Sequence, residues 1–180
     1  MKIAASQIRS IVRGLVFALV AVTLLIAEVR AAWADGRPKV HLNTSAVTAR
    51  TVEGATEISV ARDYGAAWQT LSDALDFNAT TLLDAYFVGP ARKAFGEAIA
   101  GQQNTGIHSR LINQDHKLEA VFYAPEGDVM ELHDTMTCEL QVLDQDKMIH
   151  NEQVTLRYVV LMTPGADRWT IRQLQSVPKF

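Results

Sequence analysis

The sequence predicts an α+β fold in which three N-terminal helices pack on a curved, cone-like sheet of four antiparallel strands, preceded by a signal or anchor helix. Three observations predict this fold class. Residues 106–177 alternate between apolar and polar side chains and are interrupted by three short turn sequences. Upstream, apolar residues recur at steps of three and four, as in helices that pack along one face. The first 34 residues combine positive charge with an apolar run.

Residues 1–34 are predicted to be a signal peptide or a signal anchor. Three basic residues begin the segment: Lys2, Arg9 and Arg13. Residues 14–27 are uncharged and mostly apolar, and Ala32-Trp33-Ala34 provides an A-x-A cleavage pattern. Cleavage after Ala34 is the preferred interpretation, and the alternative is an uncleaved inner-membrane anchor within residues 14–34. Both place the body outside the cytoplasm, periplasmic or secreted, because the positive flank stays on the cytoplasmic side.

The charge distribution argues against nucleic acid as a partner. The chain has a net charge of −3, and residues 1–34 contribute +3, so the remaining residues carry −6. Binding to nucleic acid depends on neutralising phosphates with Lys and Arg, and the body shows no such basic stripe. Contact with a membrane is expected only through the N-terminal segment, if that segment is not cleaved.

Residues 35–58 are predicted to be a flexible tether, because they are rich in Thr, Ala, Ser and Val and show little periodicity. Residues 59–180 then form the folded domain. Its helices are expected over residues 59–76, around residues 82–87, and from Pro90 to Gly101. The third helix is expected to end at Gly101, because glycine is favoured just beyond a helix C-terminus, and a polar loop over residues 102–106 then leads into the sheet.

The alternation within the sheet assigns a buried face. In the second strand, residues 130–142, the even positions are apolar and the odd positions are polar, with one exception. The apolar positions near the C-terminus step from Ile171 to Leu174, which breaks the period of two and predicts a bulge or twist. The single cysteine, Cys138, lies on the apolar face and is predicted to be a small buried hydrophobe.

The exception is Asp134, which stands on the apolar face between Leu132 and Met136. A carboxylate there is unfavourable unless it is hydrogen-bonded, paired or protonated. A bulge near His133 could rotate Asp134 outward. It could instead be a structural carboxylate bonded to helix N-termini or to a tyrosine hydroxyl. It could also line a ligand cavity with a raised pKa and act as a base.

The five histidines do not predict a metal site, because none are spaced as ligands on one helix or one strand. No cofactor is expected either. His116 is the one histidine placed to approach Asp134, if it shares the inner face of the first strand with Leu118.

The C-terminal half carries two short motifs, Thr155-Leu156-Arg157-Tyr158-Val159-Val160 and Asp167-Arg168-Trp169-Thr170-Ile171. With three helices before a long antiparallel meander, they resemble the ending of domains in the nuclear transport factor 2-like, or cystatin-like, superfamily. The resemblance covers about residues 59–177. It implies a curved sheet that wraps helices around a conical cavity.

This superfamily resemblance implies two classes of function. Enzymes of the superfamily, such as ketosteroid isomerases and scytalone dehydratases, use an Asp with Tyr or His in the cavity. By residue type, the catalytic candidates here are Asp134, Tyr158 and His116. The ligand-binding candidates are Tyr86, Phe122, Asp134, Tyr158 and Trp169. Other members are membrane-tethered scaffolds, and an export or anchor segment followed by a tether and one domain looks more like these.

The first functional hypothesis is therefore an extracytoplasmic binding or scaffold module, not an enzyme. Its partner would be an unidentified protein or a small apolar ligand, and a homodimer through the sheet is a further expectation. The alternative is a small-molecule isomerase, dehydratase or cyclase, in which Asp134 removes a carbon-bound proton and Tyr158 polarises a carbonyl.

Overall fold

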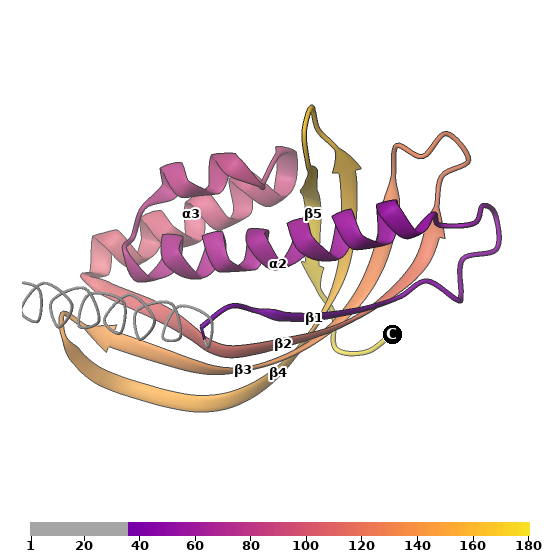
Figure 1. Cartoon of the computed structure of the whole chain (residues 1–180). Helices are drawn as coiled ribbons and strands as arrows, with labels where there is room; N and C mark the ends of the chain where they lie inside the picture. Colours follow the sequence, from indigo (N-terminus) through magenta and orange to yellow (C-terminus); the bar gives the residue numbers. More distant parts are fainter. Residues whose placement is uncertain (1–35) are drawn as a thin grey trace, which may run out of the picture. The chain divides into compact units, whose positions relative to one another are not determined.

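A five-stranded mixed sheet dominates the computed structural model, which describes residues 36–180 (Figure 1). Its strands are β1 Lys39–Asn43, β2 Ile107–Tyr123, β3 Met130–Asp144, β4 Lys147–Pro164 and β5 Trp169–Ser176, in that spatial order. Strands β2 to β5 form the predicted antiparallel meander, and β1 pairs parallel to β2. The predicted signal or anchor segment, residues 1–34, lies outside the described residues.

The prediction of four strands was wrong, because β1 adds a fifth. This strand lies within the range 35–58 that was expected to be a tether. Its residues alternate between exposed and half-buried, with Val40 and Leu42 packed against the core. Gly65 lets β1 lie close to a helix, because a Cβ there would come within 3.2 Å of Val40 Cγ2. A five-residue strand with so few apolar positions gives little signal in a sequence.

Three helices lie against one side of the sheet (Figure 1). They are α2 Gly54–Asp76, the 3-10 helix η1 Thr80–Ala85, and α3 Gly89–Thr105. Helix α3 continues through residues 102–105, so the prediction of a loop there was wrong. It ends at Gly106, which adopts the left-handed conformation with φ of 73°. The side chains of Gln102 and Gln103 bond carbonyl groups of Leu75 and Asn78, which fixes this last turn.

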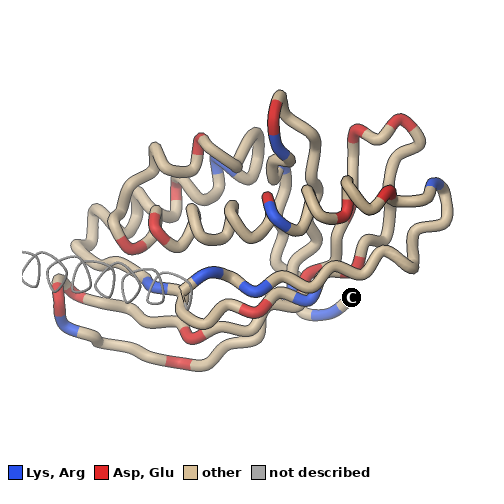
Figure 2. Tube along the Cα trace, in the orientation of Figure 1, with Lys and Arg blue, Asp and Glu red and all other residues tan. Residues whose placement is uncertain are grey.

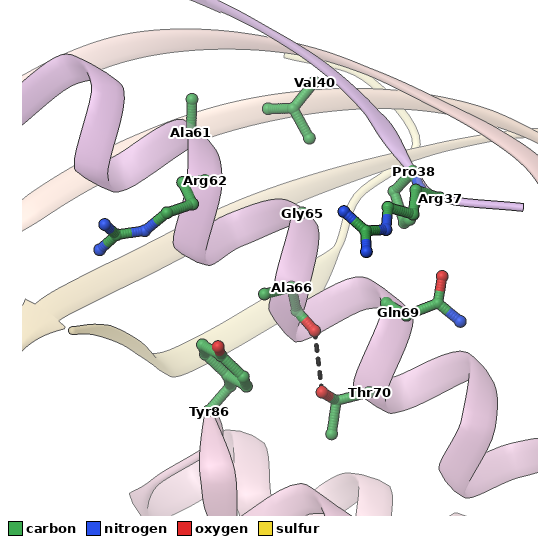
Figure 3. Close-up of a pocket in the computed structure, with 10 residues that line it drawn as sticks. All are labelled: Arg37, Pro38, Val40, Ala61, Arg62, Gly65, Ala66, Gln69, Thr70 and Tyr86. Atoms are coloured by element: carbon green, nitrogen blue, oxygen red, sulfur yellow. Dashed lines mark hydrogen bonds between the residues drawn. The ribbon is translucent and has the colours of Figure 1, made fainter. Parts of the chain in front are cut away.

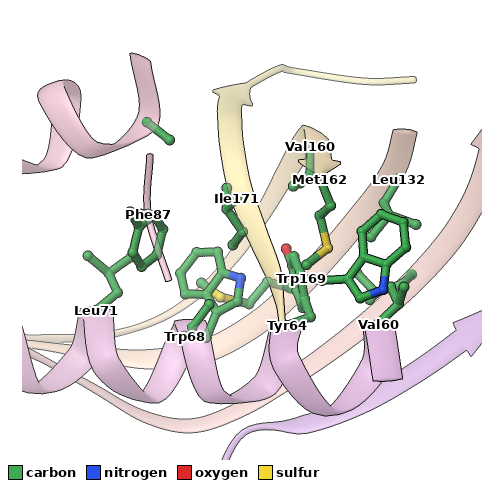
Figure 4. Close-up of a cluster of buried hydrophobic side chains, with 14 of the residues drawn as sticks. Val60, Tyr64, Trp68, Leu71, Phe87, Leu132, Val160, Met162, Trp169 and Ile171 are labelled. Carbon is green, nitrogen blue, oxygen red and sulfur yellow. The ribbon is translucent and has the colours of Figure 1, made fainter. Parts of the chain in front are cut away.

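The core lies between α2 and the inner face of the sheet (Figure 4). The even positions of β3 are buried as predicted from Met130 to Cys138, whereas Leu140 and Val142 are only half-buried. Burial raises the pKa of the Cys138 thiol to about 11. The predicted irregularity near Ile171 is confirmed, because the pairing of β4 with β5 shifts between Leu161 and Met162, opposite Gln173 and Ile171.

His108 joins three parts of the fold near the start of β2. Its Nδ1 atom lies 2.8 Å from Asp76 Oδ1 at the end of α2, and its Nε2 atom lies 2.6 Å from the Gln145 carbonyl oxygen in the β3–β4 turn. Both partner atoms accept hydrogen bonds, so the doubly protonated ring satisfies both. The Gln145 carbonyl, and then Asp76, raise the pKa of His108 in the folded protein.

We expect His108→Asn to lower the free energy of unfolding more at pH about 5.5 than at pH about 8.5. Because the folded-state pKa is raised, the contribution of the charged ring is fully present below the unfolded-state pKa of about 6.5. It is lost as the pH rises through the folded-state pKa. Urea unfolding across this pH range measures the difference, with His150→Asn in the exposed part of β4 as the control. A difference that stays constant or grows with pH would contradict the assignment.

Candidate functional site

Asp134 lies at the centre of the sheet's inner face. It is paired with Leu118 in β2 and with Tyr158 in β4, and its side chain is fully buried. The strand pairing continues without a shift on both sides of this position. The interpretation that a bulge near His133 turns Asp134 outward was therefore wrong. The side chain points into the core, where it needs hydrogen-bond donors.

Two donors from different elements meet the same oxygen of Asp134. The Tyr64 hydroxyl, on α2, donates to Asp134 Oδ2 over 2.7 Å, and His116 Nδ1, on β2, lies 2.8 Å from that oxygen. All three side chains are fully buried. The prediction that His116 approaches Asp134 is confirmed. Tyr64 was not predicted as a partner, because its helical spacing only marked it as a core residue. We call Asp134, Tyr64 and His116 the Asp134 cluster.

Aromatic side chains enclose the Asp134 cluster. The Trp68 ring lies 4.7 Å from the His116 ring and 5.5 Å from the Tyr158 ring, measured between centroids. Burial, and then the Asp134 charge, raise the pKa of Tyr64 well above its usual value. Burial also raises the pKa of Tyr158 to about 12. Both phenols therefore stay protonated at neutral pH, and the Tyr64 hydroxyl acts as a hydrogen-bond donor.

The outer end of His116 meets a second polar side chain. Its Nε2 atom lies 3.4 Å from Gln114 Oε1, while the Gln114 amide donates to the Leu111 carbonyl. With the amide in this orientation, both ring nitrogens of His116 face acceptor oxygens. Asp134 Oδ1, by contrast, has no hydrogen-bond partner among residues 36–180.

Burial limits the chemistry that the Asp134 cluster can perform. A general base must come within hydrogen-bond reach of the proton it removes. Asp134, His116 and Tyr64 are each 0% exposed. Trp68, which packs beside them, is 1% exposed. The geometry favours the structural account of Asp134, in which a tyrosine hydroxyl satisfies a buried carboxylate. A role for Asp134 as a cavity base stays a prediction.

The other predicted site residues are spread over the domain. Tyr158 is half-buried and stands directly opposite Asp134. Trp169 is buried beside Tyr123, and its backbone N–H donates to Asp63 Oδ2. Phe122 is 43% exposed on β2. The structure therefore brings together Asp134, His116 and Tyr158 but places Phe122 and Trp169 in different surroundings.

Tyr86 lines a groove on the outer side of α2, which we call the α2 groove (Figure 3). Its volume is about 580 Å³. The residues that line it come from the segment before β1, from β1, from α2 and from the position that follows η1: Arg37, Pro38, Val40, Ala61, Arg62, Gly65, Ala66, Gln69, Thr70 and Tyr86. The sequence analysis missed this groove, because it depends on β1 lying over small residues of α2.

The α2 groove is locally basic on an acidic domain. Two arginines line it and no Asp or Glu does. Arg62 bonds the Asp63 carboxylate through two nitrogens, at 2.8 and 3.2 Å. Arg37 makes no ion pair with any residue of the described part of the chain. Elsewhere, charges of both signs are distributed along the trace (Figure 2).

Within residues 36–180, no three His, Cys, Asp or Glu side chains gather as a metal site would require. The same residues contain no helix that is long and apolar enough to cross a membrane.

No protein-family model and no curated protein matches the sequence. Solved structures do match. The intermembrane-space region of the chloroplast protein ARC6 is 11% identical, with a TM-score of 0.56, covering 71% of this chain and 98% of that one. A candidate scytalone dehydratase from Novosphingobium aromaticivorans is 14% identical, with a TM-score of 0.40, covering 64% and 83%. A protein of unknown function from Nostoc punctiforme, with a cystatin-like fold, is 11% identical, with a TM-score of 0.39, covering 72% and 96%.

These similarities concern the fold. The helices, the curved antiparallel meander and the match to the ARC6 region confirm the predicted resemblance at that level. The chain shares an α+β fold with the intermembrane-space region of ARC6.

We expect Tyr64→Phe to lower the free energy of unfolding by about 1–3 kcal/mol, because it leaves a fully buried carboxylate with one donor fewer. Urea unfolding measures the change. Tyr158→Phe is the matched control, since it also removes one tyrosine hydroxyl, from the neighbouring strand. This hydroxyl forms no hydrogen bond with any residue of the described part. Equal effects of the two substitutions would contradict the role assigned to Tyr64.

Proposed function

We propose that this protein is an extracytoplasmic binding module without catalytic activity, and that the α2 groove is its binding surface. The observation that carries the proposal is the complete burial of Asp134, the best candidate for a catalytic base. Its Oδ2 atom is shared between Tyr64 and His116, so this carboxylate is occupied in holding α2 to the sheet.

The α2 groove has features of a binding site. Its volume of about 580 Å³ falls in the range of about 300–1,000 Å³ that is usual for small-molecule sites. Its walls come from elements far apart in the sequence, the segment 37–40 and η1, on both sides of α2. Tyr86, a ligand-binding candidate from the sequence, is part of this wall.

The extracytoplasmic location rests on the N-terminal sequence. Residues 1–34 have the charge pattern and cleavage motif of an export segment. The ARC6 region, which has the same fold, is described as lying in an intermembrane space. We propose a comparable location for this domain, outside the membrane to which its N-terminal segment directs the chain.

A second candidate function is a small-molecule isomerase, dehydratase or cyclase. One observation favours it: Asp134 Oδ1 has no partner among the described residues, and Tyr158 stands directly opposite on β4. This hypothesis requires the core to open, because a substrate must reach a side chain that is fully buried.

Nuclear magnetic resonance of the ¹⁵N-labelled domain, mixed with a soluble extract of the compartment to which the chain is exported, tests the proposal. We expect saturable shifts at Gly65 and Ala66 in the wild type and in Tyr158→Phe. We expect none in Ala66→Phe, which fills the α2 groove. Filtering the extract by size separates a protein partner from a small ligand.

Two results would contradict the proposed function. The first is the absence of groove shifts with any extract fraction. The second is shifts that centre on Asp134 and Tyr158 and disappear in a folded Asp134→Asn variant, which would support the enzyme. If Asp134→Asn does not fold, Tyr158→Phe takes its place in this comparison.

A further inference from the structure

We propose that the α2 groove binds a small amphipathic carboxylate, with its hydrocarbon chain on α2 and its carboxylate on Arg37. The proposal rests on the proposed function and names the class of ligand. It follows from three properties of the groove: an apolar floor, a wall in which the Val40 side chain packs closely on Gly65, and one guanidinium directed towards the floor.

The floor is apolar because the outward face of α2 carries very small side chains here. Ala61, Gly65 and Ala66 line the groove, and each is half-buried. Larger residues at these positions would fill the volume. The hydroxyl of Thr70 donates to the Ala66 carbonyl over 2.8 Å, so this polar group is already satisfied within the helix. A hydrocarbon chain can therefore lie on the helix without burying an unpaired polar group.

The wall on the β1 side is held close to the helix. Val40 Cγ2 lies 3.2 Å from where a Cβ of residue 65 would be, and the Pro38 carbonyl oxygen lies 3.8 Å from the same point. A larger residue at position 65 would require the Val40 side chain to shift by a few tenths of an ångström. Tyr86 stands on the opposite side of α2 (Figure 3). The α2 groove is thus formed before a ligand binds, which lowers the entropy cost of ordering its walls on binding.

The charge of the ligand follows from the arginines. In Figure 3, the Arg37 guanidinium points towards Gly65 of α2, whereas the Arg62 guanidinium points away from Gly65. Arg62 is neutralised by Asp63, but Arg37 pairs with no carboxylate of residues 36–180. Gln69 donates to Asp73, which does not line the groove. Arg37 is therefore the anion-binding group.

A carboxylate fits this arrangement better than a phosphate does. A guanidinium matches a carboxylate through two parallel hydrogen bonds, and one such pair neutralises a single negative charge. A doubly charged phosphate needs further donors, which the apolar floor does not provide. The volume of about 580 Å³ has room for a flexible chain of medium length beside the head group.

Decanoate is the probe for this proposal, with decanol as the uncharged analogue and decylamine as the cationic one. Titration of the labelled domain is followed by nuclear magnetic resonance. We expect decanoate to shift the signals of residues 38–40, 61–70 and 86 saturably. We expect decanol to bind the same residues about tenfold more weakly or worse, because it lacks the charge-assisted bonds. Decylamine is not expected to bind.

Arg37→Gln is expected to weaken decanoate binding about tenfold and to leave decanol binding unchanged. Arg92→Gln is the matched control, because Arg92 lies on α3 and pairs with Asp84 outside the groove. Ala66→Phe is expected to abolish binding of both ligands, and Ala61→Phe is the second filling variant if the first does not fold.

Equal affinity for decanoate and decanol, or no effect of Arg37→Gln, would overturn the carboxylate assignment while leaving the groove as a binding site. Decanoate shifts outside the groove, or no binding at all, would also overturn it. A different result would contradict the proposed function: no shift at Gly65 and Ala66 with the extract of the export compartment.

Discussion

The need to satisfy one buried carboxylate constrains the arrangement of this domain. Asp134 stands in the middle of the inner face of the sheet and has no access to water. Its Oδ2 atom takes one donor from α2 and one from β2, so the helix and two adjacent strands must meet at this point. Hydrogen bonds in a low-dielectric core are short-ranged and directional, so these two bonds and the apolar packing around them favour the same position of α2 on the sheet. The Asp134 cluster is therefore compatible with one register of α2 on the sheet, the register that also packs the apolar face of the helix.

The helix register has a consequence on the opposite side of α2. With Tyr64 and Trp68 facing the core, Ala61, Gly65 and Ala66 face outward, where β1 and η1 pass. The α2 groove exists because small residues fall on this outward face and because Gly65 admits the close approach of Val40. The buried polar cluster and the exposed groove therefore lie on opposite faces of α2. We infer that the first is structural and the second is the binding surface.

Much of the fold could be predicted from the sequence, because the meander is long and its faces alternate clearly. The exception at Asp134 was visible, and so was the approach of His116, since both follow from a period of two within strands. The partner Tyr64 could not be predicted, because its spacing marks only a core position and the helix–sheet docking that brings it to Asp134 is tertiary. Strand β1 and the α2 groove were missed for a related reason. A short strand and a stripe of small residues give little signal separately, and they form the groove only when the tertiary fold brings them together. The functional class rested on resemblance and remains a proposal.

The most direct test of the account is the stability and groove binding of a triple variant, Tyr64→Phe, His116→Leu and Asp134→Leu. If the cluster is structural, replacing all three polar groups by apolar ones removes the buried carboxylate together with both of its donors, and such replacements are often neutral or stabilising. We predict that the variant folds with a free energy of unfolding within about 2 kcal/mol of the wild type and gives the wild-type groove shifts. A variant that folds but loses those shifts would contradict the account, because the buried carboxylate would then be needed for function. A variant that does not fold would contradict the claim that apolar packing can replace the cluster.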